Sequence, residues 1–345
     1  MHYGGKRISL RFRFPFKTPK MWLVMILALA MPVSIACWLV TLVYTTVNGG
    51  AHCITPWRWL VATVAPIMIA RYGLKKGSLD KSGAIAGLIV GFVLTISSLC
   101  FFACLLTFFI LGSRATKYKS SAKKKFEDNF KEGGQRNWIQ VLCNGGIAAQ
   151  FAVLYMLDSG CTEKVVDFQA WYTPSFFSMA VLGALACSCG DTFASEIGTV
   201  FSINTVPRLI TSFRIVPKGT NGGITFIGTL SSAMGGAIVG VAYYLTLLMC
   251  TSDFQLQKSP AQWLIVLTGA LAGLLGSTID SYLGALFQYS GFHRKKNCIV
   301  EHPGPDVEFI SGSDVLDNHS VNLLSSLLTG LLTPKIAFYL WQSVM

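Results

Sequence analysis

Acidic side chains at the ends of apolar segments are the residues with the clearest chemical potential. The run Gly190–Gly198 carries Asp191, Ser195 and Glu196 directly after a long apolar stretch. An ionisable group at such a place is costly in a membrane, so it is retained where it has a partner, a cavity or a task. On an ideal helix Asp191 and Ser195 share one narrow face with Gly198, whereas Glu196 points about 140° away. This face predicts a magnesium or phosphate site, or else a tight helix contact in which Asp191 caps a helix or joins an ion pair.

A glycine-rich loop, residues 216–225, leads into a second long apolar segment. Backbone N–H groups at Gly219, Gly222 and Gly223 would face the positive end of a helix dipole, which suits an anionic phosphate. Lys218 and the hydroxyl of Thr220 would add a charge and a further donor. The alternative is an ordinary turn between two spans, with Lys218 reaching to lipid headgroups.

A third acidic group lies in the last two apolar segments. Asp280 lies between Gly276 and Gly284 on one helical face. The following segment carries a polar stripe at helical spacing, formed by Asn318, Asn322, Ser325 and Thr329. Asp280 bonded to this stripe would fix a helical bundle, but a lone carboxylate in an apolar span also indicates function.

The composition defines the kind of molecule in which these residues lie. Of 345 residues, 52% are apolar and only 13% are charged, which is too little polar surface for soluble domains of this size. The ten cysteines are scattered and show no paired metal-ligand spacing. The net charge of +12 is typical of topogenic loops and not of nucleic-acid binding. We therefore expect an all-α polytopic membrane protein whose partner is the lipid bilayer.

The apolar segments predict a bundle of about eight or nine transmembrane helices, some short or broken, because about 20 apolar residues cross the hydrocarbon core. The candidate spans are Met21–Val47, Trp57–Ala70, Gly83–Leu111, Trp138–Leu157, Ser175–Cys189, Ile224–Cys250, Ala261–Tyr289 and Val321–Trp341. They form one integral-membrane domain, residues 21–345, behind a basic arm, residues 1–20. The first span is expected to be a retained anchor, with a mitochondrial presequence as the alternative. Within the span from Ile224, small residues recur every four positions at 228, 232, 236 and 240, which predicts close helix packing.

The distribution of Lys and Arg predicts the orientation. If Gly83–Leu111 crossed once, the basic loop 112–137 would face the lumen, so we expect this stretch to break near residues 95–99 into two short passes or a hairpin. All but four of the 28 basic residues then lie in the cytosol, and loop 158–174 in the lumen is acidic. The alternative topology is one in which Trp57–Ala70 does not cross the membrane. We expect a cytosolic N-terminus, a cytosolic Asn318 sequon, and residence in the endoplasmic reticulum.

Five motifs in order resemble the transmembrane protein 19 family, an integral-membrane family that includes the plant phytyl-phosphate kinase. The motifs are A-T-K-Y-K, G-D-T-F-A-S-E-I-G, P-K-G-T-N-G-G, G-S-T-I-D-S-Y-L-G-A-L-F-Q and L-D-N-H-S-V-N, and the similarity extends from about Trp57 onward. The matching positions include Asp191, Glu196, Lys218, Gly219, Asp280 and Asn318. Plant members tend to have K-G-T-E-G, where this chain has Asn221 in place of the carboxylate.

The resemblance implies phosphoryl transfer from a nucleoside triphosphate, with CTP as one candidate, to a prenyl alcohol or prenyl monophosphate. On this hypothesis Asp191, Glu196 and Asp280 are catalytic, and Asp191 and Asp280 also hold Mg²⁺. Lys218, Gly219, Thr220, Gly222 and Gly223 bind phosphate, while Ser195, Asn318 and Asn322 give polar support. A transporter or a catalytically silent membrane protein are the alternatives. Charged motifs at span ends favour an interfacial enzyme over a transporter.

Overall fold

The computed structural model describes residues 19–47, 54–118, 134–201 and 205–344. The chain forms two compact units, residues 1–64 and 65–345, which we describe separately. The basic arm, apart from Pro19 and Lys20, and the central part of the basic loop, residues 119–133, lie outside the described residues. The helices are α1 (Pro19–Val47), α2 (Pro56–Lys75), α3 (Lys81–Ser97), α4 (Leu99–Lys117), α6 (Trp138–Ser159), α7 (Tyr172–Phe193), α8 (Thr199–Phe201), α9 (Phe226–Cys250), α10 (Asp253–Lys258), α11 (Leu264–Phe287) and α12 (Asn318–Val344), with a π-helical turn, η1 (Ala194–Gly198), after α7.

The fold is that of an all-α polytopic membrane protein, as the composition predicted. Within the described ranges, six helices are long and apolar enough to cross a membrane, and two shorter apolar helices accompany them. The six are α4, α6, α7 with η1, α9, α11 and α12, and the two shorter ones are residues 32–47 of α1 and the whole of α3. Of an apolar stretch of 18 residues within Tyr172–Gly198, 78% are buried, so α7 is the central helix of the larger unit.

A helical hairpin replaces the single long span over residues 83–111. Ser98 adopts an extended conformation between α3 and α4, and its hydroxyl caps α4 by accepting a hydrogen bond from the Cys100 N–H at 3.2 Å. Helix α4 then runs back to the end of the bundle where α3 begins. The evidence is that Lys117, at the end of α4, donates to Ser78 Oγ at 3.0 Å, and Ser78 lies just before α3. The predicted break near residues 95–99 is therefore confirmed, and both ends of the hairpin lie at the same end of the bundle.

The tip of this hairpin contacts the acidic loop between α6 and α7. A carboxylate oxygen of Glu163 accepts a hydrogen bond from the Leu99 N–H at 2.8 Å. A negative charge at this place complements the free N–H groups and the dipole at the start of α4. The acidic loop and the basic segments around Lys117 consequently lie at opposite ends of the bundle, the arrangement that the charge distribution predicted.

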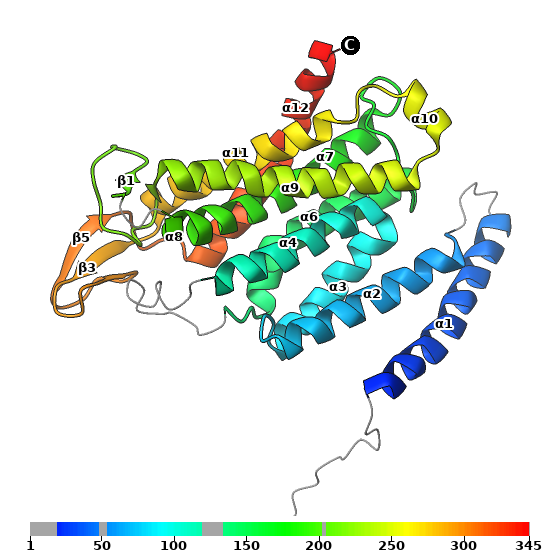
Figure 1. The fold of residues 1–345 in the computed structure, drawn as a ribbon, viewed down its shortest axis with the longest axis horizontal. Helices are drawn as coiled ribbons and strands as arrows, with labels where there is room; N and C mark the ends of the chain where they lie inside the picture. Colours follow the sequence, from blue (N-terminus) through cyan, green and yellow to red (C-terminus); the bar gives the residue numbers. More distant parts are fainter. Residues whose placement is uncertain (1–18, 48–53, 119–133, 202–204, 345) are drawn as a thin grey trace, which may run out of the picture. The chain divides into compact units, whose positions relative to one another are not determined.

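Three central helices pack through their glycines. A Cβ atom at Gly190 of α7 would lie 2.7 Å from the Gly273 carbonyl oxygen in α11 and 2.9 Å from the Ser232 carbonyl oxygen in α9. A Cβ atom at Gly240 of α9 would lie 2.9 Å from the carbonyl oxygen of Ile265 in α11. Helices α7, α9 and α11 therefore run side by side in backbone contact (Figure 1), which confirms the packing role predicted for the four-residue repeat of small residues.

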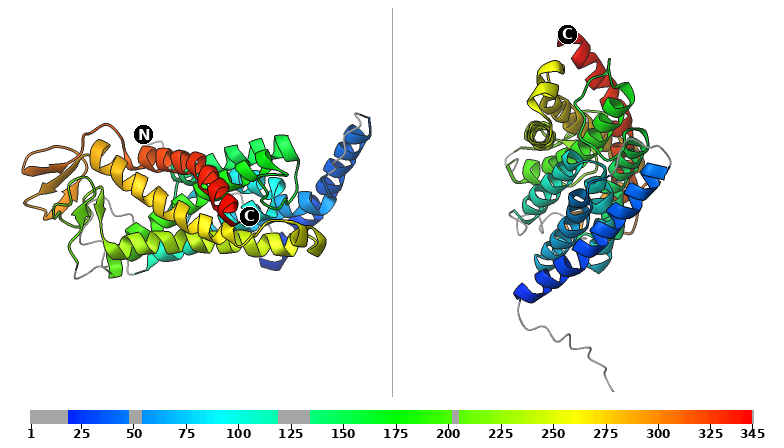
Figure 2. Two further views of the ribbon diagram at one scale, coloured as in Figure 1. Left: turned by 90° about the horizontal axis from the view of Figure 1, so that it is seen from above. Right: turned by 90° about the vertical axis from the view of Figure 1, so that its right-hand side faces the viewer.

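Short strands form two small sheets at one end of the bundle, and the sequence did not predict them. Strands β1 (Arg208–Leu209) and β2 (Gly223–Ile224) pair antiparallel, and β3 (Ser290–His293), β4 (Cys298–Val300) and β5 (Val307–Ser311) form an antiparallel sheet in the order β4-β3-β5. The two views in Figures 1 and 2 agree that this sheet lies at the end of the bundle opposite α10. The sheet connects the end of α11 to the start of α12.

Candidate functional site

The ends of six helices meet around one polar cavity of about 890 Å³. They are the C-terminal ends of α4, α7 and α11 and the N-terminal ends of α6, α9 and α12. All the site residues predicted from the sequence line this cavity: Asp191, Ser195, Glu196, Lys218, Gly219, Thr220, Gly222, Gly223, Asp280, Asn318 and Asn322. Segments far apart in the sequence are thus brought together, while the chemical roles of these residues remain predictions.

Asp280 is bonded to the polar stripe of α12. Its Oδ2 atom accepts a hydrogen bond from Ser325 Oγ at 3.1 Å. With the Asn322 amide turned so that its nitrogen faces Asp280, this nitrogen donates to the same oxygen at 3.1 Å and to the Asn318 carbonyl oxygen at 3.3 Å. Asp280 therefore joins α11 to α12, as the structural alternative predicted, and it also borders the cavity.

Asp191 differs from Asp280 in its surroundings. In the part of the chain that the structure describes, no hydrogen bond reaches its half-buried carboxylate. The two carboxylates lie close enough for their charges to interact. Two negative charges at one cavity wall repel each other, so a cation between them would be stabilised. Asp191 has the exposure and the freedom to bind such a cation directly.

A π-helical turn changes the helix face that the sequence predicted. Ala194–Gly198 forms η1 instead of continuing α7 as a regular helix, and π turns of this kind are frequent at functional sites. Glu196 consequently borders the same cavity as Asp191, although an ideal helix would direct it away. Gly198 is not part of the cavity wall, because it packs against α9, where a Cβ atom would lie 2.6 Å from the Gly228 Cα.

The glycine-rich loop is folded differently from the predicted phosphate cradle. The Gly223 N–H donates to the Thr220 carbonyl oxygen at 3.0 Å, and the Thr220 hydroxyl donates to the Pro217 carbonyl oxygen at 2.7 Å. Thr225 Oγ1 caps α9 by accepting from the Gly228 N–H at 3.1 Å. In this structure turn bonds use the Gly223 N–H and the Thr220 hydroxyl, and the phosphate-binding roles of both residues remain predictions.

Gly219 and Gly222 adopt left-handed backbone conformations, with φ of 89° and 76°. A side chain is strained in this region, so the tight turn requires glycine at both positions. The turn holds Lys218 at the wall of the cavity. Of the predicted loop, the cation at Lys218 is the part best placed to meet a phosphate.

Arg136 is a cavity residue that the sequence analysis assigned to a topogenic loop. Its backbone N–H donates to the Ser78 carbonyl oxygen at 3.1 Å, and its own carbonyl oxygen accepts from the Asp80 N–H at 3.0 Å. The guanidinium nitrogen NH1 donates to Ser113 Oγ at 2.9 Å. Burial lowers the pKa of Arg136, yet an arginine side chain stays cationic in proteins. Two other segments, the loop at residues 78–80 and Ser113 of α4, thus hold the backbone and the guanidinium of Arg136.

Gln140 and Asn144 join Arg136 at the cavity from the first turns of α6. Asn137 begins α6 with a capping box in which its side chain and that of Gln140 bond each other's backbone N–H groups. An Asn followed three residues later by Gln before an apolar run is a sequence signal for a helix start. This signal predicts that Arg136 lies directly before a helix, but its place at the cavity depends on its bonds to Ser78 and Asp80.

Glu301 and His302, which follow β4, also line the cavity. The Nδ1 atom of His302 lies 3.3 Å from Asp314 Oδ2. Their position depends on the small sheet, for which no sequence pattern was found. These residues add one carboxylate and one imidazole to the cavity wall.

The donor set is compatible with Mg²⁺. Among the described residues no group of three or more His, Cys, Asp or Glu side chains could hold a metal ion. Mg²⁺ is commonly bound by one or two carboxylates together with water molecules and substrate phosphates, not by an all-protein cage. Asp191 and Asp280 provide such a pair beside a cavity large enough for phosphates.

The fold and the cavity define a polytopic membrane protein with a polar site at one end of its helices. The chain belongs to the family of integral membrane proteins DUF92, whose model matches residues 64–330. It is 41% identical over 287 residues to Protein PGR of Arabidopsis thaliana, covering 82% of this chain and 98% of that protein. It is 31% identical over 280 residues to the uncharacterized membrane protein MJ0933 of Methanocaldococcus jannaschii, covering 79% and 90% of the two chains.

A more distant relative is Protein VTE6, chloroplastic, of Arabidopsis thaliana. The identity is 25% over 251 residues, which cover 71% of this chain and 67% of that protein. No solved structure matches the chain.

Proposed function

We propose that the protein is a membrane-embedded kinase of isoprenoid lipids. It transfers a phosphoryl group from a nucleoside triphosphate, with CTP as one candidate, to a prenyl alcohol or prenyl monophosphate at the cytosolic face of the membrane. The observation that carries this proposal is the meeting of Asp191, Asp280 and Lys218, from three separate segments, at one large polar cavity. The resemblance to a family that includes the plant phytyl-phosphate kinase supports the same reaction.

Different residues of the cavity have different roles in the proposed phosphoryl transfer. Mg²⁺ held by Asp191 and Asp280 would neutralise charge on the nucleotide phosphates when bound. Lys218 and Arg136 stabilise negative charge on the transferred group and on the acceptor, because they are fixed cations at the cavity wall. An oxygen of the acceptor forms the new P–O bond while the bond to the nucleoside diphosphate breaks. Glu196 is placed to accept the proton of an alcohol acceptor.

We infer that the cavity faces the cytosol and that the N-terminus lies on the same side. The basic residues Arg114, Lys117 and Arg136 lie at this end of the bundle, where Lys117 and Arg136 both contact the segment around Ser78. Segments rich in Lys and Arg are retained in the cytosol. Nucleoside triphosphates are available there, and residence in the endoplasmic reticulum accords with this orientation.

Transport is the less favoured function. Transporters of known architecture place substrate and ion sites near the bilayer midplane, between broken helices. Here the acidic residues lie at one end of their helices, with extended loops and the small sheet among the cavity lining. The position of the cavity thus favours chemistry at the headgroup level.

Phosphorylation by the purified protein tests the proposal. Protein in nanodiscs is supplied with Mg²⁺, labelled CTP, ATP or GTP, and a panel of prenyl alcohols and monophosphates. We expect labelled lipid from at least one pair, and a loss of at least 100-fold in rate for Asp191→Asn. Absence of labelled lipid across the whole panel, with protein shown to be folded by its thermal unfolding, would contradict the proposal.

A further inference from the structure

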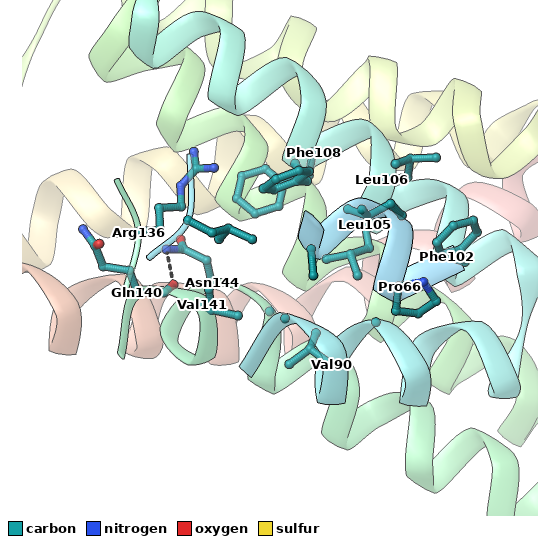
Figure 3. A pocket seen from close by; sticks show the side chains of 17 residues that line it. Pro66, Val90, Phe102, Leu105, Leu106, Phe108, Arg136, Gln140, Val141 and Asn144 are labelled. Atoms are coloured by element: carbon teal, nitrogen blue, oxygen red, sulfur yellow. Dashed lines mark hydrogen bonds between the residues drawn. The ribbon is translucent and has the colours of Figure 1, made fainter. Parts of the chain in front are cut away.

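A second, apolar cavity adjoins the polar one. It lies within the larger unit, between the second half of α2, α3, α4 and the first turns of α6, and its apolar part is formed by side chains such as Pro66, Val90, Phe102, Leu105 and Phe108. Figure 3 shows these side chains grouped on one side, with Arg136, Gln140 and Asn144 at the other end. The cavity is therefore a groove with an apolar body and a polar end.

The polar end of this groove is shared with the large cavity. Arg136, Gln140 and Asn144 line both. A molecule in the groove would therefore present its end to the site that contains Asp191 and Asp280. An elongated molecule with an apolar chain and an anionic end is complementary to the apolar groove and to its polar end.

The size of the groove selects a single chain. The space in it that is open to the centre of a water-sized molecule is about 70 Å³, compared with about 890 Å³ in the polar cavity, so the groove is much the narrower of the two. On one side Pro66 approaches Gly91 so closely that a Cβ atom there would lie 3.1 Å from the proline Cβ. At Gly87, by contrast, an added Cβ atom would find only Leu79 Cδ1, at 4.0 Å. A channel this narrow favours one hydrocarbon chain over two.

The chemistry at the polar end selects a phosphate. The guanidinium of Arg136 is planar and has five N–H donors, a geometry that matches phosphate oxygens. One of its nitrogens bonds Ser113 Oγ, and the group lies over the Phe108 ring at 5.8 Å from the ring centroid, so its direction is fixed. Lipid tails are as apolar as the groove, so the groove contributes position more than binding energy. Recognition then depends on the charge at Arg136.

We propose that the groove between α2, α3, α4 and α6 holds the hydrocarbon chain of a single-chain lipid, with the lipid phosphate bound at Arg136. This inference rests on the proposed function and locates its lipid. The phosphate bound there is that of a prenyl monophosphate acceptor, or that of the product formed from a prenyl alcohol. The lipid end thereby enters the polar cavity that Asp191 also lines.

Photocrosslinking of the full-length protein in nanodiscs tests the location without depending on turnover. The probe is a prenyl monophosphate with a diazirine in its first isoprene units. We expect crosslinks to peptides of α3 and α4, and at least tenfold less labelling in Gly87→Phe, which fills the groove. Ile89→Phe is the matched control, because Ile89 is 61% exposed on the same helix and adds its bulk outside the groove. Crosslinks elsewhere, or equal labelling in both variants, would overturn the proposal.

A second variant tests the phosphate contact and covers the case in which Gly87→Phe does not fold. Arg136→Gln is expected to weaken binding of the prenyl monophosphate at least tenfold, with little change for the prenyl alcohol of equal length, and Arg136→Lys to restore part of the loss. Equal weakening for both lipids refutes the contact. Competition by phosphatidic acid as strong as by the prenyl monophosphate refutes the single-chain groove.

The two proposals fail separately. Labelling of the groove by the probe, without phosphorylation of any lipid, leaves the lipid site in place and removes the kinase. Phosphorylation that persists in Gly87→Phe together with unchanged labelling leaves the kinase in place and removes the groove.

Discussion

Ser325 Oγ donates a hydrogen bond to Asp280 Oδ2 across 3.1 Å, and this bond joins α12 to α11 at the wall of the polar cavity. Cys187 of α7 lies next to it, with its Sγ 3.8 Å from Ser325 Oγ. The carboxylate therefore has a structural partner on one side and the cavity on the other. The structural and chemical contributions of Asp280 can be separated by comparing a substitution of Ser325 with a substitution of Asp280 itself.

Ser325→Ala removes the bond but keeps the charge of Asp280. We expect it to lower the free energy of unfolding by about 1 kcal/mol and to leave lipid phosphorylation within about threefold of wild type. Asp280→Asn should lose at least 100-fold in phosphorylation, because the amide cannot help to hold Mg²⁺. Thermal unfolding and labelled-lipid assays on the same preparations check both. Equal losses of activity in the two variants would show that Asp280 acts only as a link between helices.

The glycine contacts between α9 and α11 predict a sharp difference between two substitutions. Gly240→Ala places a methyl 2.9 Å from the carbonyl oxygen of Ile265, so helix backbones must separate, at a cost of about 1–3 kcal/mol. Gly146→Ala on α6 meets only Leu142 side-chain atoms of its own helix, at 3.8 Å, and is expected to be neutral or stabilising by up to about 1 kcal/mol. Midpoints of thermal unfolding in detergent measure the difference. Similar midpoints in the two variants would contradict this packing.

The hairpin of α3 and α4 predicts where a glycan can be attached. A sequon engineered into the acidic loop around Cys161 should be glycosylated in microsomes, because this loop and the hairpin tip share one end of the bundle. The natural sequon at Asn318 lies at the polar cavity and should stay unmodified. A mobility shift on removal of glycans by an endoglycosidase measures both. A glycan on Asn318 would reverse the orientation inferred for every helix.

The hydrogen bond of Asp317 at the start of α12 should make the free energy of unfolding depend on pH. Its side chain accepts a hydrogen bond from the Ser320 N–H at 2.8 Å, and hydrogen bonding by Ser320 lowers the pKa of Asp317. A depressed carboxyl pKa stabilises the fold above the unfolded pKa of about 3.9 and loses this effect as pH falls through the lower folded pKa. Asp317→Ala should cost about 1 kcal/mol at pH 7 and less below pH 4. Asp317→Asn keeps a capping side chain and is the control. A cost independent of pH would exclude the ionised cap.

Local patterns were sufficient for much of the fold. The positive charge of loop 112–137 required a break before it, and the break occurs at Ser98. Helical spacing on residues 318–329 predicted the polar stripe that bonds Asp280. The repeat of small residues from Gly228 predicted backbone contact between helices. Each of these three features depends on the spacing or the charge of residues within one segment of the chain.

Features set by contacts between distant segments could not be predicted in this way. The π turn at Ala194–Gly198 follows no signal in its own residues, and Gly198 packs against Gly228 of another helix. The small sheet at residues 290–311 is made of short strands without clear alternation. Arg136 reaches the cavity because its backbone is bonded to Ser78 and Asp80, more than fifty positions earlier in the chain. Asp191, Asp280 and Lys218 could therefore be recognised from patterns within their own segments, whereas Arg136 could not.

The backbone contact of α7 with α11 has a consequence for the two carboxylates that these helices carry. Helices that touch through carbonyl oxygens and glycine Cα atoms have no compressible layer between them, so neither can roll or slide while they remain together. Asp191 follows Gly190 directly, and Asp280 is two helical turns beyond Gly273 on the partner helix. In the proposed phosphoryl transfer, the main chain would therefore set the spacing of these two residues before substrate binds, and little reorganisation energy would be spent when charge develops between them.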